Sequence, residues 1–280
     1  MPPAVSVIGD ALLDVHVTPA VSPRPGEDVP AAIRLGPGGQ GANLAVRLAR
    51  RGVSVTLTCA LADDAPGRLV RSALEADGVE LHAVQADATG VVVVLLDDRG
   101  DRTMLSQRAP FASAAAERSA VDAWLVLSGY LLLEPSSEAL ARSLAAFPAR
   151  RVLVGCAVPD DLVAAWRSAA AAFAPELVVM NAIEMERLMV DALGSAVTDA
   201  GGATATIGAA TAEARLPPGS AAVDTTGAGD AFAAALVAGL LDATWPPSQP
   251  MLHEALRGAV ELAAAVARTP GAQARVGAES

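Results

Sequence analysis

The chain has 280 residues, 52% of them hydrophobic, which is enough to bury a sizeable core in one large domain or two smaller ones. Its formal net charge of −11 argues against a nucleic-acid-binding surface, which needs basic side chains to neutralise phosphates, and against binding to an anionic membrane. The sequence contains no lysine, which excludes the lysine of an ordinary P-loop and any Schiff-base chemistry.

Two further features bear on the compartment. Cys59 and Cys156 each lie in an apolar stretch and form no zinc-binding pattern, so we expect buried free thiols in a reducing compartment. No apolar run is long enough to span a bilayer, and the N-terminus lacks the basic region of a signal peptide. We therefore expect a cytoplasmic protein with neither a membrane nor a nucleic-acid partner.

The first third of the chain alternates short apolar runs with turn-forming segments. In chain order we predict a strand at Val5–Ile8, strands at Val15–Val17 and Ala31–Leu35 around a proline-rich excursion, a helix at Leu44–Arg51, a strand at Val53–Leu57, and a helix from Asp63 to about Asp77 with Asp63 and Asp64 as capping residues. This pattern is typical of two strands that project from the main body of the fold and return to it.

The middle of the chain begins with a hairpin signal. Val91–Leu96 and Arg102–Ser106 are β-rich runs joined by Asp97–Asp101.

From residue 112 onward, helical and buried-strand patterns alternate. In chain order we predict helix Ala112–Asp122, strand Ala123–Leu127, a strand-like run at Leu131–Leu133, helix Pro135–Phe147, strand Val152–Cys156, helix Asp160–Phe173, strand Leu177–Met180, helix Ala231–Leu241 and helix Met251–Arg268. Repeated βα units imply a parallel sheet covered on both faces, and ligands of such sheets bind beyond the carboxyl ends of the strands.

The stretch Asp224–Phe232, Asp-Thr-Thr-Gly-Ala-Gly-Asp-Ala-Phe, places two glycines at the start of an apolar helix. The first N–H groups of a helix have no partner within it and lie at the positive end of its dipole, so this is a site for an anion. Asp230 beside it suits a base for a hydroxyl that attacks a phosphoryl group. The alternative is a loop in which the aspartate only caps the helix.

A second glycine-rich segment allows two interpretations. Gly36, Gly38 and Gly41 match G-x-G-x-x-G, and Asp63 lies at a plausible distance for a ribose-binding acid, which would indicate a dinucleotide-binding fold and a dehydrogenase. However, Pro30–Leu35 is a poor central parallel strand, so we do not favour this interpretation.

Three motifs together resemble those of the ribokinase-like (PfkB-type) carbohydrate kinase family: Asp224–Phe232, Gly38-Gly39-Gln40-Gly41-Ala42-Asn43, and Asn181-Ala182-Ile183-Glu184. The resemblance runs from Val5 to Gln273. It implies a three-layer α/β/α fold in a single domain over 1–280, with a central mostly parallel sheet and a small β-sheet lid drawn from about 14–35 and 90–107. Its most familiar form has lysine where this chain has Gln40, and often serine where it has Arg275.

The resemblance also implies an activity. The enzyme would transfer the γ-phosphoryl group of ATP to a hydroxyl, in the first place a primary one, of a small sugar or sugar acid. The resemblance implies Asp230 as base and Gly227, Ala228 and Gly229 as the anion hole; the residues implied for the sugar are Asp14, Gly38, Gly39, Asn43, Glu134 and Asp230. Those implied for the nucleotide are Asn181, Thr198, Gly201, Gly202, Gly227 and Gly229. Asn181 and Glu184 would hold Mg²⁺ through water, and Asp224 and Thr226 a monovalent cation such as K⁺.

Several alternatives stay open. Asn181 and Glu184 also fit a capping box, and Glu134 also fits a helix-start acid. A nucleoside or pseudouridine kinase of the same fold is one functional alternative, although a nucleobase favours an aromatic or broad apolar platform and aromatic residues make up only 3% of the chain. A non-catalytic sugar-binding relative is the other. Exposed edges of the lid strands would allow a homodimer.

Overall fold

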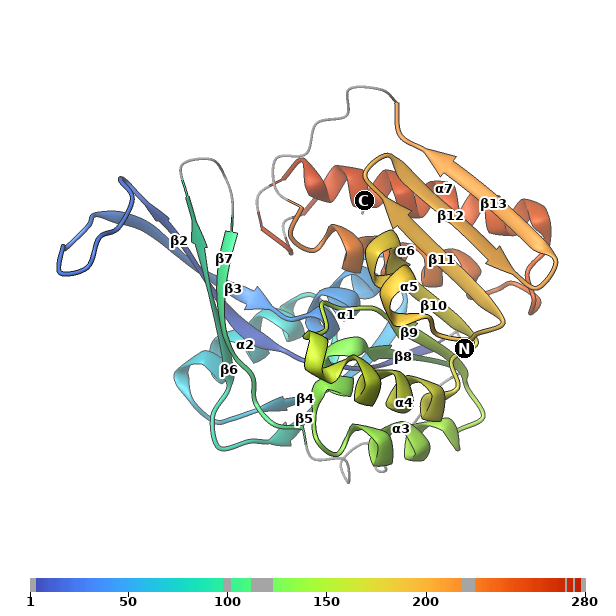
Figure 1. Ribbon diagram of the computed structural model, residues 1–280, viewed down its shortest axis with the longest axis horizontal. Helices are drawn as coiled ribbons and strands as arrows, with labels where there is room; N and C mark the ends of the chain where they lie inside the picture. The colour runs from blue at the N-terminus through green and yellow to red at the C-terminus, as the bar shows by residue number, and fades with distance from the viewer. Residues whose placement is uncertain are drawn as a thin grey trace.

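The computed structural model describes residues 4–97, 102–111, 123–217, 225–269, 271–273 and 275–277. Within these residues the chain forms a large sheet in the body of the molecule and a small sheet that projects from it (Figure 1). The mixed α/β fold with a second small sheet is the architecture that the sequence predicts. No helix in this part of the chain is both long and apolar enough to cross a membrane.

The large sheet has the strand order β13-β12-β11-β10-β9-β8-β1-β4-β5. All neighbours from β11 to β5 are parallel, whereas β12 and β13 continue the sheet as an antiparallel hairpin. The strands are β1 Ala4–Ile8, β4 Ser54–Leu61, β5 Glu80–Gln85, β8 Trp124–Ser128, β9 Arg150–Val154, β10 Leu177–Asn181, β11 Gly194–Asp199, β12 Gly202–Ile207 and β13 Ala210–Arg215.

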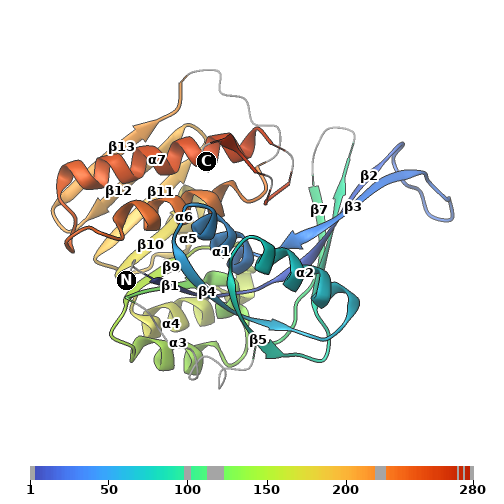
Figure 2. The same cartoon turned by 180° about the vertical axis from the view of Figure 1, so that it is seen from behind.

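Helices cover both faces of the large sheet. Successive residues of a strand point to opposite faces, so Trp124 and Val126 of β8 join one core while Leu125 and Leu127 join another. The first core lies under α1 Gln40–Arg50, α2 Ala65–Ala76, α6 Ala228–Leu240 and α7 Gln249–Ala267; the second lies under α3 Ser137–Ala145, α4 Val163–Phe173, α5 Ala182–Leu188 and the short 3₁₀ helices η2 Gly129–Leu133 and η3 Asp160–Leu162 (Figure 2).

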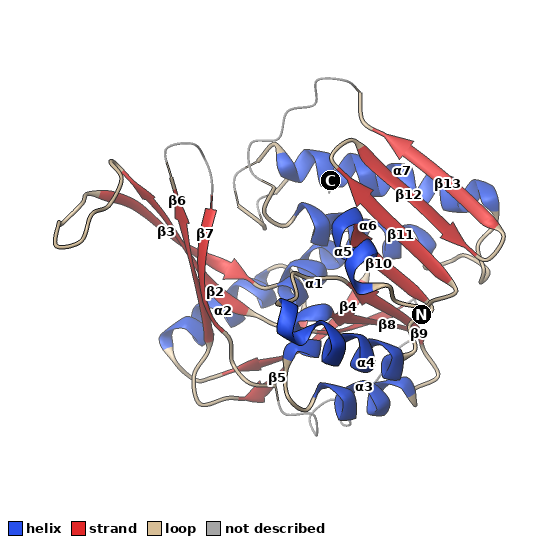
Figure 3. Cartoon of the chain, viewed as in Figure 1, coloured by secondary structure: helices blue, strands red, loops and turns tan. Residues whose placement is uncertain are grey.

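The small sheet has the order β3-β2-β6-β7, and we call it the lid. Its strands are β2 Leu12–Pro19, β3 Ala31–Gly38, β6 Gly90–Leu96 and β7 Arg102–Gln107. The proline-rich excursion and the predicted hairpin therefore pair as one sheet, β2 running antiparallel to β3 and parallel to β6. Figure 3 shows the lid extending to one side of the helix-flanked body.

Some predicted elements are wrong or shifted. Leu131–Leu133 is not a strand but part of η2, because β8 already ends at Ser128 and the leucines turn inward onto the second core. Helix α1 begins at Gln40, four residues before its predicted start, since Gly41 and Ala42 let the helix approach the body closely. Strands β5, β11, β12 and β13 have no predicted counterpart. The predicted helix 112–122 lies outside the described residues.

The dinucleotide-binding interpretation is also wrong. The strand before Gly38 is β3, which lies at the edge of the lid and pairs antiparallel with β2. Its residues from Ala31 to Leu35 are exposed. A dinucleotide fingerprint needs a central, buried parallel strand at this point. By contrast, the predicted capping role of Asp64 is confirmed, because its carboxylate accepts from the N–H of Gly67 at 2.8 Å at the start of α2.

Candidate active site

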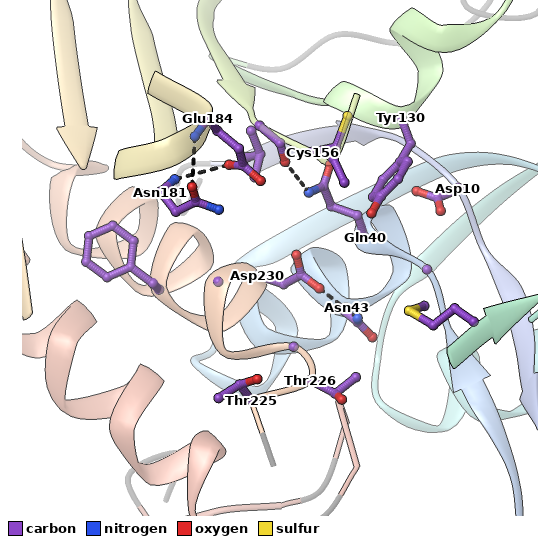
Figure 4. Close-up of a pocket in the computed structure, with 18 of the residues that line it drawn as sticks. Asp10, Gln40, Asn43, Tyr130, Cys156, Asn181, Glu184, Thr225, Thr226 and Asp230 are labelled. Atoms are coloured by element: carbon purple, nitrogen blue, oxygen red, sulfur yellow. Dashed lines mark hydrogen bonds between the residues drawn. The ribbon is translucent and has the colours of Figure 1, made fainter. Parts of the chain in front are cut away.

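A cavity of about 390 Å³ opens at the carboxyl ends of β1, β9, β10 and β11, where sequence reasoning expects ligands. The lid borders it on one side and the N-terminal ends of α1 and α6 on another (Figure 4). Its polar lining residues are Asp10, Asp14, Gln40, Asn43, Arg102, Arg108, Tyr130, Asn181, Glu184, Thr198, Thr225, Thr226 and Asp230. Most of the predicted site residues therefore meet in one place.

Helix α6 presents its N-terminus to this cavity. Gly227 caps the helix with φ of +75°, and a Cβ there would lie 2.8 Å from Cα of Ala272, so the position requires glycine. Gly229 has open space where a side chain would be and lines the cavity. The N–H of Ala228 donates to the carbonyl oxygen of Thr225 at 3.2 Å. The N–H groups of Gly227 and Gly229 are thus the better placed donors for an anion.

Asp230 lies in the first turn of α6 and is partly buried. Burial raises the pKa of its carboxyl to about 7, with a smaller contribution from the charge of Asp10. A hydrogen bond of 2.7 Å from Nδ2 of Asn43 to Oδ2 of Asp230 works in the opposite direction and favours the ionised form. A carboxylate with a pKa near neutrality suits a general base.

Asp14 reaches the cavity from β2 of the lid, and the chain makes room for it with glycine. The Asp14 side chain is 7% exposed in a narrow space, since a Cβ on Gly38 would lie 2.2 Å from its Oδ2. Burial, together with the charge of Asp10, raises the pKa of Asp14 to about 6. Gly39 follows with φ of +99°, and a Cβ there would lie 2.7 Å from the carbonyl oxygen of Asp10. A side chain at position 39 would thus collide with the backbone of Asp10, and one at position 38 with the carboxyl group of Asp14.

Asp10 and its partners are a part of the site that sequence reasoning did not assign. Asp10 follows β1, and its Oδ1 accepts from Ser128 Oγ at 3.1 Å and from the N–H of Gly41 at 3.3 Å. Its Oδ2 pairs with Arg108, which follows the lid strand β7. The Arg108 guanidinium also lies 3.9 Å above the ring of Tyr130. The aspartate directly after the first strand was the one available signal.

Gln40 stands where the most familiar form of the family's motif has lysine. Its buried side chain connects separate segments of the chain by hydrogen bonds. Its Nε2 donates to the carbonyl oxygen of Gly155 at 2.8 Å. Its Oε1 accepts from Ser128 Oγ at 2.7 Å and from the N–H of Gly129 at 3.0 Å. The side chain is 8% exposed and joins the start of α1 to the ends of β8 and β9. A neutral amide with both donor and acceptor satisfies all three groups, which a lysine could not do.

Asn181 and Glu184 form the predicted capping box of α5. The N–H of Glu184 donates to Asn181 Oδ1 at 2.8 Å, and the N–H of Asn181 donates to Glu184 Oε2 at 3.1 Å. Both residues also line the cavity, and burial raises the pKa of Glu184. Gly155 must be glycine here, because its Cβ would lie 2.7 Å from Glu184 Oε2. The capping role and an oxygen-donor site for a hard cation are compatible.

A smaller cavity of about 200 Å³ adjoins the first and shares Thr198, Thr225, Gly229 and Phe232 with it. Its other walls are the β11–β12 turn and small apolar side chains of α7. They include Asp199, Ala200, Gly202, Val260, Ala263, Ala264 and Ala267. Gly201 lies in the same turn but does not line this cavity, and its N–H donates to Asp199 Oδ1 at 2.7 Å.

The lid touches the α6 loop through one arginine. Arg102, at the start of β7, donates to Thr225 Oγ1 at 2.9 Å and also to Thr226 Oγ1. Its side chain is exposed but borders the cavity. The contact places a permanent positive charge beside the two threonines that precede the helix N-terminus.

Three of the predicted site residues that the structure describes, Gly38, Gly201 and Glu134, line neither cavity. Glu134 ends η2 and does not line the cavity, whereas Tyr130 from the same 3₁₀ helix does. Asp224, expected at a monovalent-cation site with Thr226, lies outside the described residues.

A mostly parallel sheet covered by helices, with a small β-sheet lid beside a cavity at a helix N-terminus, is the arrangement of the ribokinase fold. The chain matches the pfkB family of carbohydrate kinases over residues 3–278, and it belongs to that family. The protein is therefore a carbohydrate kinase.

Individual relatives are distant. A fructokinase from Klebsiella pneumoniae is 29% identical to the chain, over 84% of the chain and 83% of that protein. The structure of a fructokinase from Xylella fastidiosa with bound ATP aligns with a TM-score of 0.79 at 19% identity, covering 98% of this chain and 94% of that one. A ribokinase from Arabidopsis thaliana complexed with ribose and ATP aligns with a TM-score of 0.75 at 21% identity, covering 98% and 95%. At these identities the two structures establish the common fold.

Proposed function

We propose that this kinase transfers the γ-phosphoryl group of ATP to a hydroxyl group, in the first place a primary one, of a small neutral sugar, with Asp230 as the general base. One observation carries the proposal. Asp230 lies in the first turn of α6, whose N-terminus suits a phosphoryl group, and it lines one cavity with Asp14 and Asn43, whose side chains suit sugar hydroxyls. A base between donor and acceptor is what transfer to a hydroxyl requires.

The acceptor end of the cavity is built for hydroxyl groups. A buried carboxylate such as Asp14 accepts hydrogen bonds from a diol, and Asn43 can both donate and accept. Among the described residues, Arg108 is the only cation at this end of the cavity that faces Asp10. The two side chains form an ion pair. With Arg108 neutralised and Asp14 still acidic, the charge balance favours a neutral sugar over a sugar acid.

Asp230 acts as base in its ionised form. With a pKa near 7 the carboxyl is protonated below neutrality, so turnover should rise with pH through about 7. The ionised carboxylate accepts the proton of the attacking hydroxyl as the oxygen forms its bond to phosphorus. The N–H groups of Gly227 and Gly229 then face the phosphoryl oxygens, and Arg102 adds a positive charge from the lid.

The nucleotide fits the second cavity. The small apolar residues of α7, Ala263, Ala264 and Ala267, leave a slot for a flat base, and Thr198 and Gly202 border it. The expected contribution of Gly201 is through its backbone, since this glycine lies in the turn beside the slot.

The oxygen donors near the phosphate end fit magnesium. Glu184 supplies a carboxylate and Asn181 an amide oxygen at the cavity wall, and Mg²⁺ usually keeps several waters in place of protein ligands. Bound there, magnesium would neutralise the phosphate oxygens. A potassium requirement through Asp224 and Thr226 stays part of the proposal, and exchange of K⁺ for Na⁺ in the assay tests it.

The nucleoside alternative receives less support. An aromatic platform favours a nucleobase, and one face of the Tyr130 ring is covered by Arg108, whose guanidinium carbon lies 3.9 Å from the ring centroid. The remaining acceptor-side wall consists of aliphatic and thioether side chains, Leu12, Val92 and Met104.

We also propose that the protein forms a homodimer through the lid. Leu35, Val15, Val93 and Leu105 lie in one cross-strand row of the lid, and Leu35 and Leu105 are 56% and 63% exposed. Exposed apolar rows on a sheet favour pairing with a second copy. Sedimentation of the wild-type chain and of a Leu35→Glu variant tests it: a dimer that this variant dissociates supports the proposal, and a wild-type monomer contradicts it.

An assay of ADP release tests the main proposal, with Mg²⁺ and K⁺ present and pentoses, hexoses, sugar acids and nucleosides as acceptors. Turnover with one neutral sugar well above all others supports it. Turnover fastest with a nucleoside or a sugar acid would replace the acceptor assignment. A panel without turnover, in a chain that binds sugars, would favour the non-catalytic alternative for this member of the family.

A further inference from the structure

Helix α1 carries a polar stripe inside the body of the protein. Gln40, Asn43, Arg47 and Arg50 are spaced by three, four and three residues, so they lie on one face of the helix. Arg47 is fully buried, an unusual position for an arginine. A buried polar face of this kind must hold specific partners, and the partners identify its role.

Those partners include the C-terminal loop. Arg47 donates from Nη2 to the carbonyl oxygen of Ala272 at 2.6 Å, and Arg50 donates from Nη1 to the carbonyl oxygen of Gln273 at 2.7 Å. Arg50 is itself held by two hydrogen bonds to Asp77, of 3.0 and 2.7 Å. The backbone of residues 272–273 is therefore fixed against α1 at two successive carbonyl groups.

The fixed loop brings the side chain of Gln273 to Asn43. Nε2 of Gln273 donates to Oδ1 of Asn43 at 2.9 Å, and Nδ2 of Asn43 donates to Oδ2 of Asp230 at 2.7 Å. An asparagine amide has a donor end and an acceptor end that are similar in shape. Because Gln273 presents an N–H, it selects the acceptor end of Asn43 for itself and turns the donor end toward Asp230.

We propose that Gln273 is a positioning residue for the catalytic base, acting through the orientation of the Asn43 amide. The inference rests on the proposed role of Asp230. With the donor end of Asn43 facing it, the ionised carboxylate is stabilised and keeps one oxygen fixed. With the amide reversed, two oxygen atoms would face each other and the carboxyl would hold its proton more tightly. The C-terminal loop thus takes part in setting the pH at which the base works.

Several charged groups around Asp230 act on it independently of Gln273. From the loop after β1 the charge of Asp10 raises the pKa of Asp230, and from α1 the charge of Arg47 lowers it. Other titratable or charged groups lining the same cavity are Asp14, Arg102, Arg108, Tyr130 and Glu184. A change at Gln273 leaves all of these side chains in place, so its effect can be separated from theirs.

The decisive variant is Gln273→Glu, which keeps the length of the side chain and replaces the donor by an acceptor. The new carboxylate should draw the donor end of Asn43 to itself and present the acceptor end to Asp230. We expect the acid limb of kcat/KM against pH to move up by about one unit, with activity about tenfold lower at pH 6.5 and largely recovered at pH 9. Gln273→Met, which removes the donor without adding charge, should shift the limb in the same direction by less.

A second readout does not depend on turnover. The carboxyl ¹³C resonance of Asp230, assigned by its loss in Asp230→Asn, is titrated without ATP or sugar in the wild type, in Gln273→Glu and in Gln273→Met. The control is Gln249→Glu, the same substitution at a glutamine whose side chain is hydrogen-bonded elsewhere, to the backbone of Thr211. We expect this control to move neither the resonance nor the acid limb.

The outcomes separate the two proposals. A raised Asp230 pKa in Gln273→Met as well as in Gln273→Glu, together with a shifted acid limb, supports both, whereas a rise in Gln273→Glu alone is the direct effect of its added charge and contradicts the positioning role. A raised pKa in both variants with an unmoved limb supports the positioning role and contradicts the base assignment. If the pKa is unchanged in Gln273→Glu and in Gln273→Met, and activity falls equally at every pH, the positioning inference is overturned and Gln273 only stabilises the loop. Thermal unfolding identifies a variant that fails to fold.

Discussion

The cavity is lined by two regions that differ sharply in how they are held. On the body side the strands are buried on both faces; all five residues of β8 are buried, for example. On the lid side all six residues of β7 are exposed, and the lid has a small buried cluster of its own, Leu12, Val92 and Val94. The body is thus a rigid frame, whereas the lid is held by few apolar contacts.

The polar contacts show the same contrast. Asn43, Gln40 and Asp230 on the body side are joined to each other or to backbone by buried or partly buried hydrogen bonds. The lid reaches the body near the cavity through Arg102 and Arg108, at side chains that solvent can reach. Regions with few buried contacts open at low free energy. We therefore expect the body to hold the catalytic groups. We expect the lid to control access to the cavity and to add the positive charges of Arg102 and Arg108.

The largest effect should come from the body, at Asp230. Asp230→Asn removes the proton acceptor and keeps the shape and the contact with Asn43, so kcat should fall by about 10²–10⁴-fold while the sugar still binds. Steady-state kinetics and calorimetric titration of the sugar measure the two effects. Near-normal turnover in this variant would contradict the base assignment and, with it, the division between body and lid.

This part of the site could be predicted from sequence, and the reason is local. Asp230, Gly227 and Gly229 lie within four residues of one another at the start of a helix, so their geometry follows from the helix itself. The same holds for Asn181 and Glu184 in their capping box. The order of strands and helices in the body was mostly predictable because buried strands read as continuous apolar runs.

The rest of the site could not be predicted because it depends on contacts between distant segments. Asn43 and Gln273 are 230 residues apart, and Arg108 and Asp10 are 98 apart. The missed strands β12 and β13 do alternate between buried and exposed residues, but their buried residues are mainly alanine, which gives a weak apolar signal. The polar stripe of α1 was a usable signal, since a buried arginine at helical spacing from an active-site asparagine implies a partner.

The second-largest effect should arise at Gly38, where lid strand β3 ends beside the body. In Gly38→Ala the new methyl group would lie 2.2 to 2.5 Å from three atoms of the Asp14 carboxyl group, so Asp14 must move. A displacement of about 1 Å can lower catalytic efficiency by about 100-fold, and here the loss should appear in the KM for the sugar and not in that for ATP.

Gly36→Ala is the matched control for this substitution. Gly36 lies two residues earlier in β3, and a methyl group there would meet nothing within 4 Å. We expect kinetics close to those of the wild type. A similar rise in KM in both variants would mean that the lid strand in general, and not the space around Asp14, determines sugar binding.

A smaller effect should follow from changes in the lid. Arg102→Gln removes the positive charge beside Thr225 and Thr226, so kcat should fall by about tenfold with less change in the KM for the sugar. Thermal stability should change little, because exposed polar contacts contribute about 0–1 kcal/mol. Arg34→Gln is the control, since Arg34 is an exposed lid arginine that does not border the cavity. An equal loss of kcat in Arg34→Gln would mean that Arg102 has no specific role in turnover.

The smallest effect concerns stability and comes from Asp14, where lid and body meet. Its carboxyl has a pKa of about 6 in the folded protein against an ordinary value of 3.8, mainly because of burial, so the folded state binds the proton more tightly than the unfolded state. The stabilising contribution of the protonated group is therefore complete below about pH 4 and is lost as the pH rises through about 6.

Asp14→Asn removes this dependence, and it should raise Tm at pH 8 relative to the wild type by more than at pH 4, on the order of 1–2 kcal/mol in unfolding free energy. Urea unfolding at both pH values measures the difference, with Asp63→Asn, which changes a carboxylate that is 87% exposed, as the control. A gain that is the same at both pH values would mean that the Asp14 carboxyl is charged throughout, and that the lid leaves it far better hydrated than its 7% exposure indicates.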